Sequence, residues 1–202
     1  MSLPQYLKRE MFRCTSVAAI ILTGGLLSGC AVPPLPLKLP QATPENTQQL
    51  RSADLAPVAV GNFVLEIGKP AIIDQLVSPR GTPVASLYNG SFSQYLREAL
   101  RVELDAAGLL DSRAKVSISG ELIDSDVIAP IGTGNARLAA RFIVKDGATT
   151  KYARSFDVRA EWDSSFYGNT AFQTAIDQYQ RLYQKLLGRL FSDPAFKAAV
   201  AK

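Results

Sequence analysis

The chain has 202 residues and a formal net charge of +4, with 22 Lys and Arg against 18 Asp and Glu. A charge this small does not indicate nucleic-acid binding. The sequence contains no histidine, which removes the commonest general base, the commonest metal ligand and every serine–histidine or cysteine–histidine arrangement. We therefore expect a protein that is not an enzyme and that uses no cofactor and no metal.

The N-terminus has the pattern of a secretory signal. Residues 1–13 carry three basic side chains against one acidic one, and residues 14–29 are uncharged and largely apolar. A basic segment followed by a short apolar core is typical of a signal peptide. A permanent membrane-spanning helix needs about 20 apolar residues, which is more than this run contains. A start at Met11 would leave the same apolar core.

The apolar run ends in Leu27-Ser28-Gly29-Cys30. These four residues resemble the lipobox of bacterial lipoproteins, in which a peptidase cuts before a cysteine whose sulfur carries a diacylglycerol. The resemblance implies a signal peptide over residues 1–29 and a lipidated Cys30 that anchors the chain to a membrane. Ala31 stands where an Asp tends to retain such proteins at the inner membrane, which favours the periplasmic face of the outer membrane. The alternative is an ordinary signal or an uncleaved anchor, with Cys30 merely a small residue.

Residues 30–56 are predicted to be a tether. They contain several prolines and many polar side chains, a composition that does not bury enough surface to fold. Fully extended at about 3.1 Å per residue, residues 31–56 would reach roughly 80 Å. The alternation of Leu35, Leu37 and Leu39 leaves open a short strand that docks on the domain.

The folded domain is predicted to span residues 57–202. Its first strand is 57–65, a nearly continuous apolar run. Residues 66–90 have no clear period but remain apolar, so they either pack on their own core or meet a partner. A capping box at Ser91–Gln94 opens a helix that runs to about Ala107.

Three strands with alternating apolar and polar residues follow, at 114–124, 136–145 and 151–162. Asp146-Gly147 predicts a hairpin turn between the last two strands. A second capping box, at Thr170–Gln173, predicts the start of a long C-terminal helix.

The fold class that follows is α+β. The element order β-α-β-β-β-α predicts a two-layer sandwich, with a mainly antiparallel four-stranded sheet and two helices on one face. The first strand is placed in the middle of the sheet, parallel to one neighbour.

One candidate binding site emerges on the polar face of the three strands. Lys115, Arg137, Arg141 and Arg159 point outward and would form a basic strip for a phosphate-bearing lipid or an acidic partner. The acidic residues interleaved with them, Glu121, Asp157 and Glu161, favour ordinary cross-strand pairing instead.

Two weaker patterns remain. Gly132-Thr133-Gly134-Asn135 is glycine-rich, but without a following helix or a Lys-Ser/Thr pair it reads as a hairpin turn and not as a phosphate loop. Asp124, Asp126 and Asp163 could meet as carboxylates, but they lack calcium-loop spacing and are expected to be solvated. A hydrolase that uses carboxylates only, such as Asp124 with Asp126 or Glu161, is a further alternative, which the absence of histidine disfavours.

The lipobox, the proline-rich segment and the element order together resemble the small outer-membrane lipoproteins of the YajG type. They are also similar in layout to the auxiliary lipoproteins of lipid-transport ABC systems. These resemblances imply a non-enzymatic accessory or binding component of the cell envelope that binds another envelope protein. The alternative is a lipid-binding auxiliary component of an ABC-type transport system.

Overall fold

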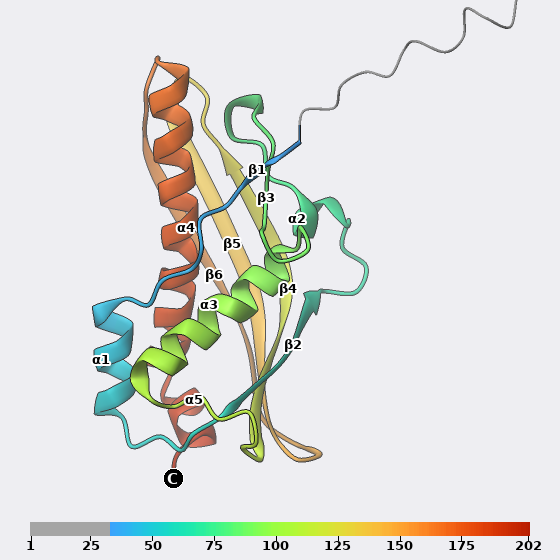
Figure 1. The fold of residues 1–202 in the computed structure, drawn as a ribbon, viewed down its shortest axis with the longest axis vertical. Helices are drawn as coiled ribbons and strands as arrows, with labels where there is room; N and C mark the ends of the chain where they lie inside the picture. The colour runs from blue at the N-terminus through green and yellow to red at the C-terminus, as the bar shows by residue number, and fades with distance from the viewer. Residues whose placement is uncertain (1–32) are drawn as a thin grey trace, which may run out of the picture. The chain divides into compact units, whose positions relative to one another are not determined.

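The computed structural model describes residues 33–202, and these residues form an α+β fold around one four-stranded sheet, which confirms the predicted class (Figure 1). The signal peptide, the Leu27–Cys30 motif and Ala31 lie outside the described residues. The strands of the sheet, in the order β2-β4-β5-β6, are β2 Ala59–Leu65, β4 Val116–Ile128, β5 Gly132–Asp146 and β6 Thr149–Ser164.

The sheet is mixed rather than purely antiparallel. Strands β4, β5 and β6 form an antiparallel meander, whereas β2 runs parallel to β4. The predicted parallel neighbour is therefore present, but the prediction of a central first strand is wrong, because β2 lies at the edge. A short hairpin takes β4 directly into β5, so β2, which needs a helical crossover to run parallel, is left with the outer side of β4.

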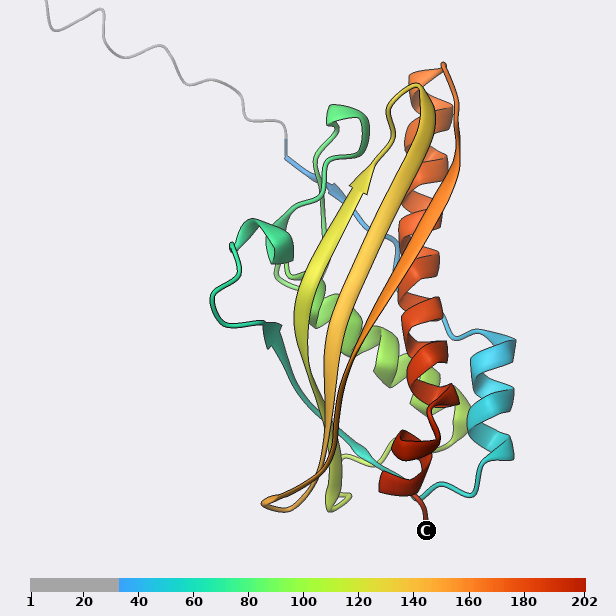
Figure 2. The same ribbon diagram turned by 180° about the vertical axis from the view of Figure 1, so that it is seen from behind.

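Two long helices cover one face of the sheet, as predicted. They are α3 Phe92–Ala107 and α4 Gly168–Ser192; both lie in front of the strands in Figure 1 and behind them in Figure 2, where the other face is bare. The predicted layout had only two helices, whereas the described residues form three further short ones. These are α1 Pro44–Ser52, α2 Ile72–Gln75 and α5 Pro194–Ala199. A single 3-10 turn, η1 Pro79–Gly81, accompanies them.

The core lies between the two helices and the inner face of the sheet. Strand β5 contributes Leu138, Ala140 and Phe142, all fully buried. Helix α4 contributes Tyr179 and Tyr183, whose rings meet edge to face with centroids 5.4 Å apart. The predicted apolar faces of these elements are therefore the faces that pack.

A bulge in β4 explains why its strand is longer than predicted. The pairing with β5 shifts between Leu122 and Asp124, so the buried side switches from Leu122 to Ser125 and Val127. Strict alternation fails at this point, and the sequence pattern ended the strand there. The bulge directs the Ser125 hydroxyl inward, where it hydrogen-bonds to the Tyr179 hydroxyl.

The helix boundaries test the two predicted capping boxes. Ser91 Oγ accepts a hydrogen bond from the Gln94 backbone N–H at 3.2 Å, so the first box does begin α3. The second is wrong, because α4 begins earlier, at Gly168, and no side chain caps it. Strand β6 continues to Ser164, which leaves only a three-residue connection, and the helix has to start at once.

Residues 34–56 are folded onto the domain and do not form an extended tether. Strand β1, Leu35–Pro36, pairs in parallel with β3, Val84–Ala85, which agrees with the docking strand that the alternating leucines left open. Helix α1 follows, and Leu50 on it is fully buried. The segment has few apolar residues, but the protein buries most of them, and this is what the composition argument missed.

Residues 66–90, between β2 and α3, were expected either to pack on their own core or to stay available to a partner, and they do part of each. Val77 and Val84 pair in an isolated bridge and are buried in the core. Ile67 and Ile72 instead lie on the surface, with Ile67 97% exposed. Within residues 33–202, no helix has both the length and the apolar character that a bilayer crossing requires.

Candidate functional site

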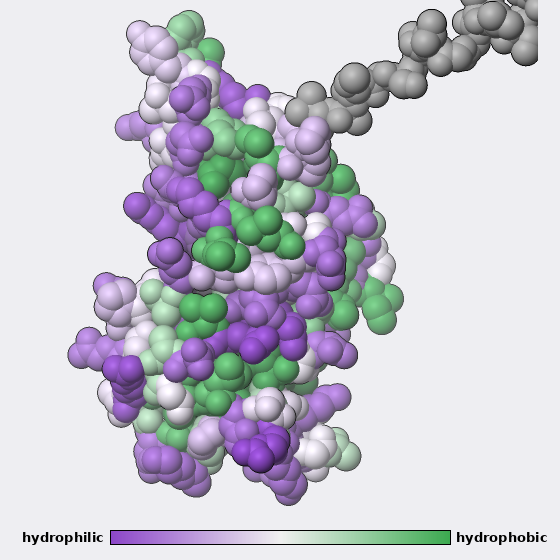
Figure 3. Space-filling model, in the orientation of Figure 1, coloured by the Kyte–Doolittle hydropathy of each residue, from purple (hydrophilic) through white to green (hydrophobic). Residues whose placement is uncertain are grey.

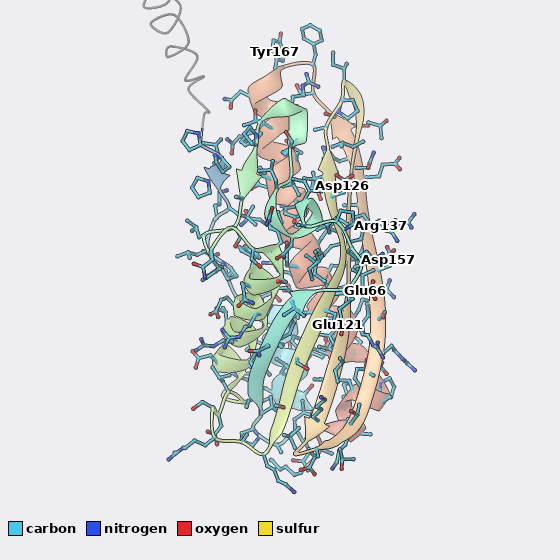
Figure 4. The ribbon with its side chains drawn as sticks, turned by 90° about the vertical axis from the view of Figure 1, so that its right-hand side faces the viewer. Glu66, Glu121, Asp126, Arg137, Asp157 and Tyr167 are labelled. Atoms are coloured by element: carbon cyan, nitrogen blue, oxygen red, sulfur yellow. The ribbon has the colours of Figure 1, made fainter. Side chains whose placement is uncertain are left out.

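The three predicted arginines do share the bare outer face of the sheet, whereas Lys115 lies just before β4 and pairs with Asp146 at 3.0 Å. Figure 4 shows Asp126, Arg137 and Asp157 in a row along it. Arg137 on β5 lies between its two neighbouring strands: its Nη1 donates to Asp124 Oδ2 at 2.6 Å and its Nε to Asp157 Oδ2 at 2.8 Å. The hydrogen bond from Arg137 lowers the pKa of the Asp157 carboxyl, although partial burial opposes this shift.

The two other arginines of the predicted site also have acidic partners. Arg141 Nη1 lies 3.7 Å from Glu121 Oε2 on the paired position of β4. Arg159 Nε lies 3.2 Å from Asp157 Oδ1. The strip is thus a ladder of ion pairs, cross-strand for Arg137 and Arg141 and within β6 for Arg159, which agrees with the pairing alternative. Binding by these arginines stays a prediction.

A groove lies beside this ladder. Its volume is about 960 Å³, and it runs between α2 and the upper part of the outer face. One wall is apolar and is formed by Ile72, Ile73 and Leu76; the other carries Arg137, Arg159 and Glu161. A surface with an apolar wall facing alternating charges suits a polypeptide better than a small apolar molecule.

The other sequence candidates do not come together as a reactive site. Asp124 is paired with Arg137, whereas Asp126 is exposed and Asp163 lies near the far end of β6. Residues 33–202 contain no cluster of acidic or cysteine side chains arranged to hold a metal ion.

The glycine-rich stretch is a strand and not a turn. Gly132 already begins β5, and Gly134 lies under the Trp162 ring of β6. A Cβ on Gly134 would lie 2.4 Å from Trp162 Cε2, so the glycine makes room for the indole. The turn itself is displaced to residues 129–131.

The sequence analysis overlooked a buried acid on α3. Glu103 is only 1% exposed and accepts hydrogen bonds from the Thr43 backbone N–H and from Asn46 Nδ2, the latter at 2.8 Å. Burial raises the pKa of the Glu103 carboxyl, and these hydrogen bonds offset only part of the shift. Glu103 lies in the apolar stripe, three residues after Leu100, so its position was the available signal.

Glu103 fastens the start of α1 to the two long helices. Its carboxylate accepts from residues of the first turn of α1, where the helix dipole favours negative charge. A cavity of about 350 Å³ adjoins it, lined mainly by polar side chains of α3, α4 and residues 38–41. With these partners, Glu103 attaches α1 to the long helices.

Comparison with known proteins supports the fold. No protein-family model and no curated protein sequence matches the chain. The structure is similar to that of a Xanthomonas campestris protein of the DUF330 family. That similarity has a TM-score of 0.51 at 10% identity and covers 79% of this chain and 95% of the other.

Two further solved structures are more distant. A putative lipoprotein from Caulobacter crescentus has a TM-score of 0.44 at 14% identity, covering 76% of this chain and 95% of that one. A minor lipoprotein from Acinetobacter baumannii has a TM-score of 0.37 at 13% identity, covering 68% and 94%. At 10% identity, the similarity to the Xanthomonas campestris protein concerns the fold alone.

Proposed function

We propose that this protein is a lipid-anchored component of the bacterial cell envelope, held on the periplasmic face of the outer membrane through Cys30. The observation that carries the proposal is the basic leader and apolar run ending in Leu27-Ser28-Gly29-Cys30. Three acids on the outer face, Glu121, Asp124 and Asp157, are engaged by arginines, which supports a binding role over acid–base chemistry by these residues. The narrower assignment to YajG-type lipoproteins stays a prediction.

The anchor is tested by replacing the cysteine. Wild-type protein expressed with labelled palmitate should carry the label and sediment with outer membranes, whereas Cys30→Ser should carry none and leave the membrane fraction, since covalent acyl chains are the anchor. A Cys30→Ser protein that is exported, trimmed and membrane-bound like the wild type would contradict the proposal.

The groove beside α2 is the surface that we assign to an envelope protein partner. A photo-crosslinking side chain at Ile72, which is half exposed on the apolar wall, should capture that partner in intact cells. Arg159→Glu on the opposite wall should abolish the adduct, while Arg113→Glu, an exposed residue that does not line the groove, should not.

The alternative is a lipid-binding auxiliary role in an ABC-type transport system. The apolar wall of the groove favours this lipid-binding role, because an acyl chain could lie against it. Lipid that co-purifies with the wild type and is lost in Ile72→Asp, together with crosslinks to lipid rather than protein, would select this alternative.

A further inference from the structure

Four segments of the chain meet at one end of the domain, which we call the apical end: residues 33–36, 79–83, 128–133 and 165–170. The Arg80 guanidinium joins three of them, since it donates to the Ala129 carbonyl at 3.0 Å and to the Phe166 carbonyl at 2.8 Å. The fourth is joined through β1, because the Leu35 N–H donates to the Pro83 carbonyl at 2.9 Å. A shared depression lined by Leu35, Arg80 and Gly168 confirms that the segments adjoin.

The apical end is almost free of charge, in a chain of which 20% of residues are charged. Residues 127–136 and 164–176 contain no Asp, Glu, Lys or Arg, and residues 75–90 contain only Arg80. Both Arg80 hydrogen bonds go to carbonyls within the domain. The exposed Asp163, which pairs with Thr133, is an acidic group beside these segments. A surface with few charges, and with its cation already engaged, has little electrostatic cost on approaching a bilayer.

The same end exposes large apolar and aromatic side chains. Phe166 is 72% exposed, Tyr167 74% and Ile131 64%. Tyr167 projects from the tip in Figure 4, and Figure 3 shows apolar surface at the end where α4 begins. Tyrosine is enriched where proteins meet the headgroup region of a membrane, because its ring is apolar and its hydroxyl is wet. Phe166 and Ile131 add apolar surface beside it.

The covalent chain limits where this end can lie. Cys30 precedes Leu35, the first residue of β1, by five residues. Five residues span at most about 18 Å, whatever conformation they adopt. A lipid on Cys30 therefore holds β1, and with it the apical end, close to the bilayer surface.

We propose that the apical end rests in the headgroup layer of the same leaflet that holds Cys30, with Ile131, Phe166 and Tyr167 as its interfacial anchors. This inference rests on the proposed lipidation of Cys30. The partner is a lipid surface, and the three anchors add their own apolar burial to that of the acyl chains. The domain then stands upright, with the β5–β6 hairpin at its opposite end (Figure 1).

The test uses the full-length lipoprotein reconstituted into vesicles of phosphatidylethanolamine and phosphatidylglycerol. Tyr167→Cys and the control Ala148→Cys, in the exposed hairpin at the other end, each receive an environment-sensitive fluorophore. Vesicles with brominated acyl chains should blue-shift and quench the probe at position 167 and leave the probe at 148 unchanged. Equal behaviour of the two probes, with an aqueous quencher reaching both, would overturn the proposal.

Two measurements separate the possible failures. Mass spectrometry of the purified chains reports acylation of Cys30, so an unlipidated chain defeats the proposed function, whereas a lipidated chain with a water-exposed probe at 167 defeats only this inference. The double variant Phe166→Ser/Tyr167→Ser, at two exposed positions where folding is not at stake, should lose lipid quenching of a probe at Ile131→Cys. Quenching that persists undiminished in that variant would contradict the anchoring role of the two aromatic residues.

Discussion

Glu103 makes stability depend on pH in a direction opposite to that of most carboxylates. Its pKa is raised in the folded state by burial, against an ordinary value of about 4.3 when unfolded. The folded protein therefore holds this proton more tightly, so the contribution to stability is fully present below about pH 4.3 and is lost as pH rises through the folded pKa.

A matched pair of variants isolates this contribution. In denaturant titrations from pH 4 to pH 7, the stability of wild type relative to Glu103→Gln should fall as pH rises, because the amide carries no proton to lose. Asp105→Asn, an exposed acid on the same helix, is the control and should show no such trend. If the stabilities of wild type and Glu103→Gln changed equally with pH, burial would not disfavour the charged form of the Glu103 carboxyl.

At the scale of elements, α1 packs on the domain through Leu50, while Glu103 and other side chains hydrogen-bond it to the long helices. Leu50 is fully buried against the long helices, so Leu50→Ala should lower the free energy of unfolding by about 2–5 kcal/mol. Gln48→Ala, on the exposed side of the same helix, should change it by no more than about 0.5 kcal/mol. Equal, negligible effects in thermal melts would mean that residues 44–52 do not belong to the core.

The register of β2 against β4 depends on a glycine. Phe63 lies across Gly120, and a Cβ there would come within 2.4 Å of the Phe63 ring. Gly120→Ala should therefore destabilise the protein by about 1–3 kcal/mol. Gly61→Ala is the control, because its Cβ would be 3.5 Å from the nearest atom, and it should be neutral or stabilising by up to about 1 kcal/mol. Equilibrium unfolding of both variants checks the contrast.

At the scale of the whole molecule, the periodicity of apolar residues predicted the elements whose buried faces are regular. The inward residues of β5 alternate without interruption and those of α3 follow a helical stripe, so both elements were found with small errors at their ends. The parallel pairing of β2 was predicted, but its edge position was not, because strand order depends on contacts between distant segments. Helix α1 was missed for the same reason. Asn46 on this helix donates a hydrogen bond to Glu103, which lies 57 residues further along the chain.

The candidate site, too, was predictable only where it depends on regular strands. The ion pairs of Arg137 and Arg141 follow from strand alternation and register, and the sequence already placed acids and arginines on one face. The groove depends on α2, a four-residue helix inside a stretch without periodicity, so no pattern could have located its apolar wall. The apical end was divided among four segments and became visible only when the fold brought them together.

The side chains of α3 that reach β2 have a consequence for crowding. Arg97 Nε and Gln94 Nε2 donate to the Gly61 and Phe63 carbonyls, at 2.9 and 2.6 Å, along the outer edge of the sheet. Neighbouring molecules tethered to one surface collide far more often than molecules free in three dimensions, and an open strand edge invites them to polymerise. With these two acceptors already occupied, the β2 edge is a poorer template for a second copy, which would limit pairing through that side among molecules anchored as we propose.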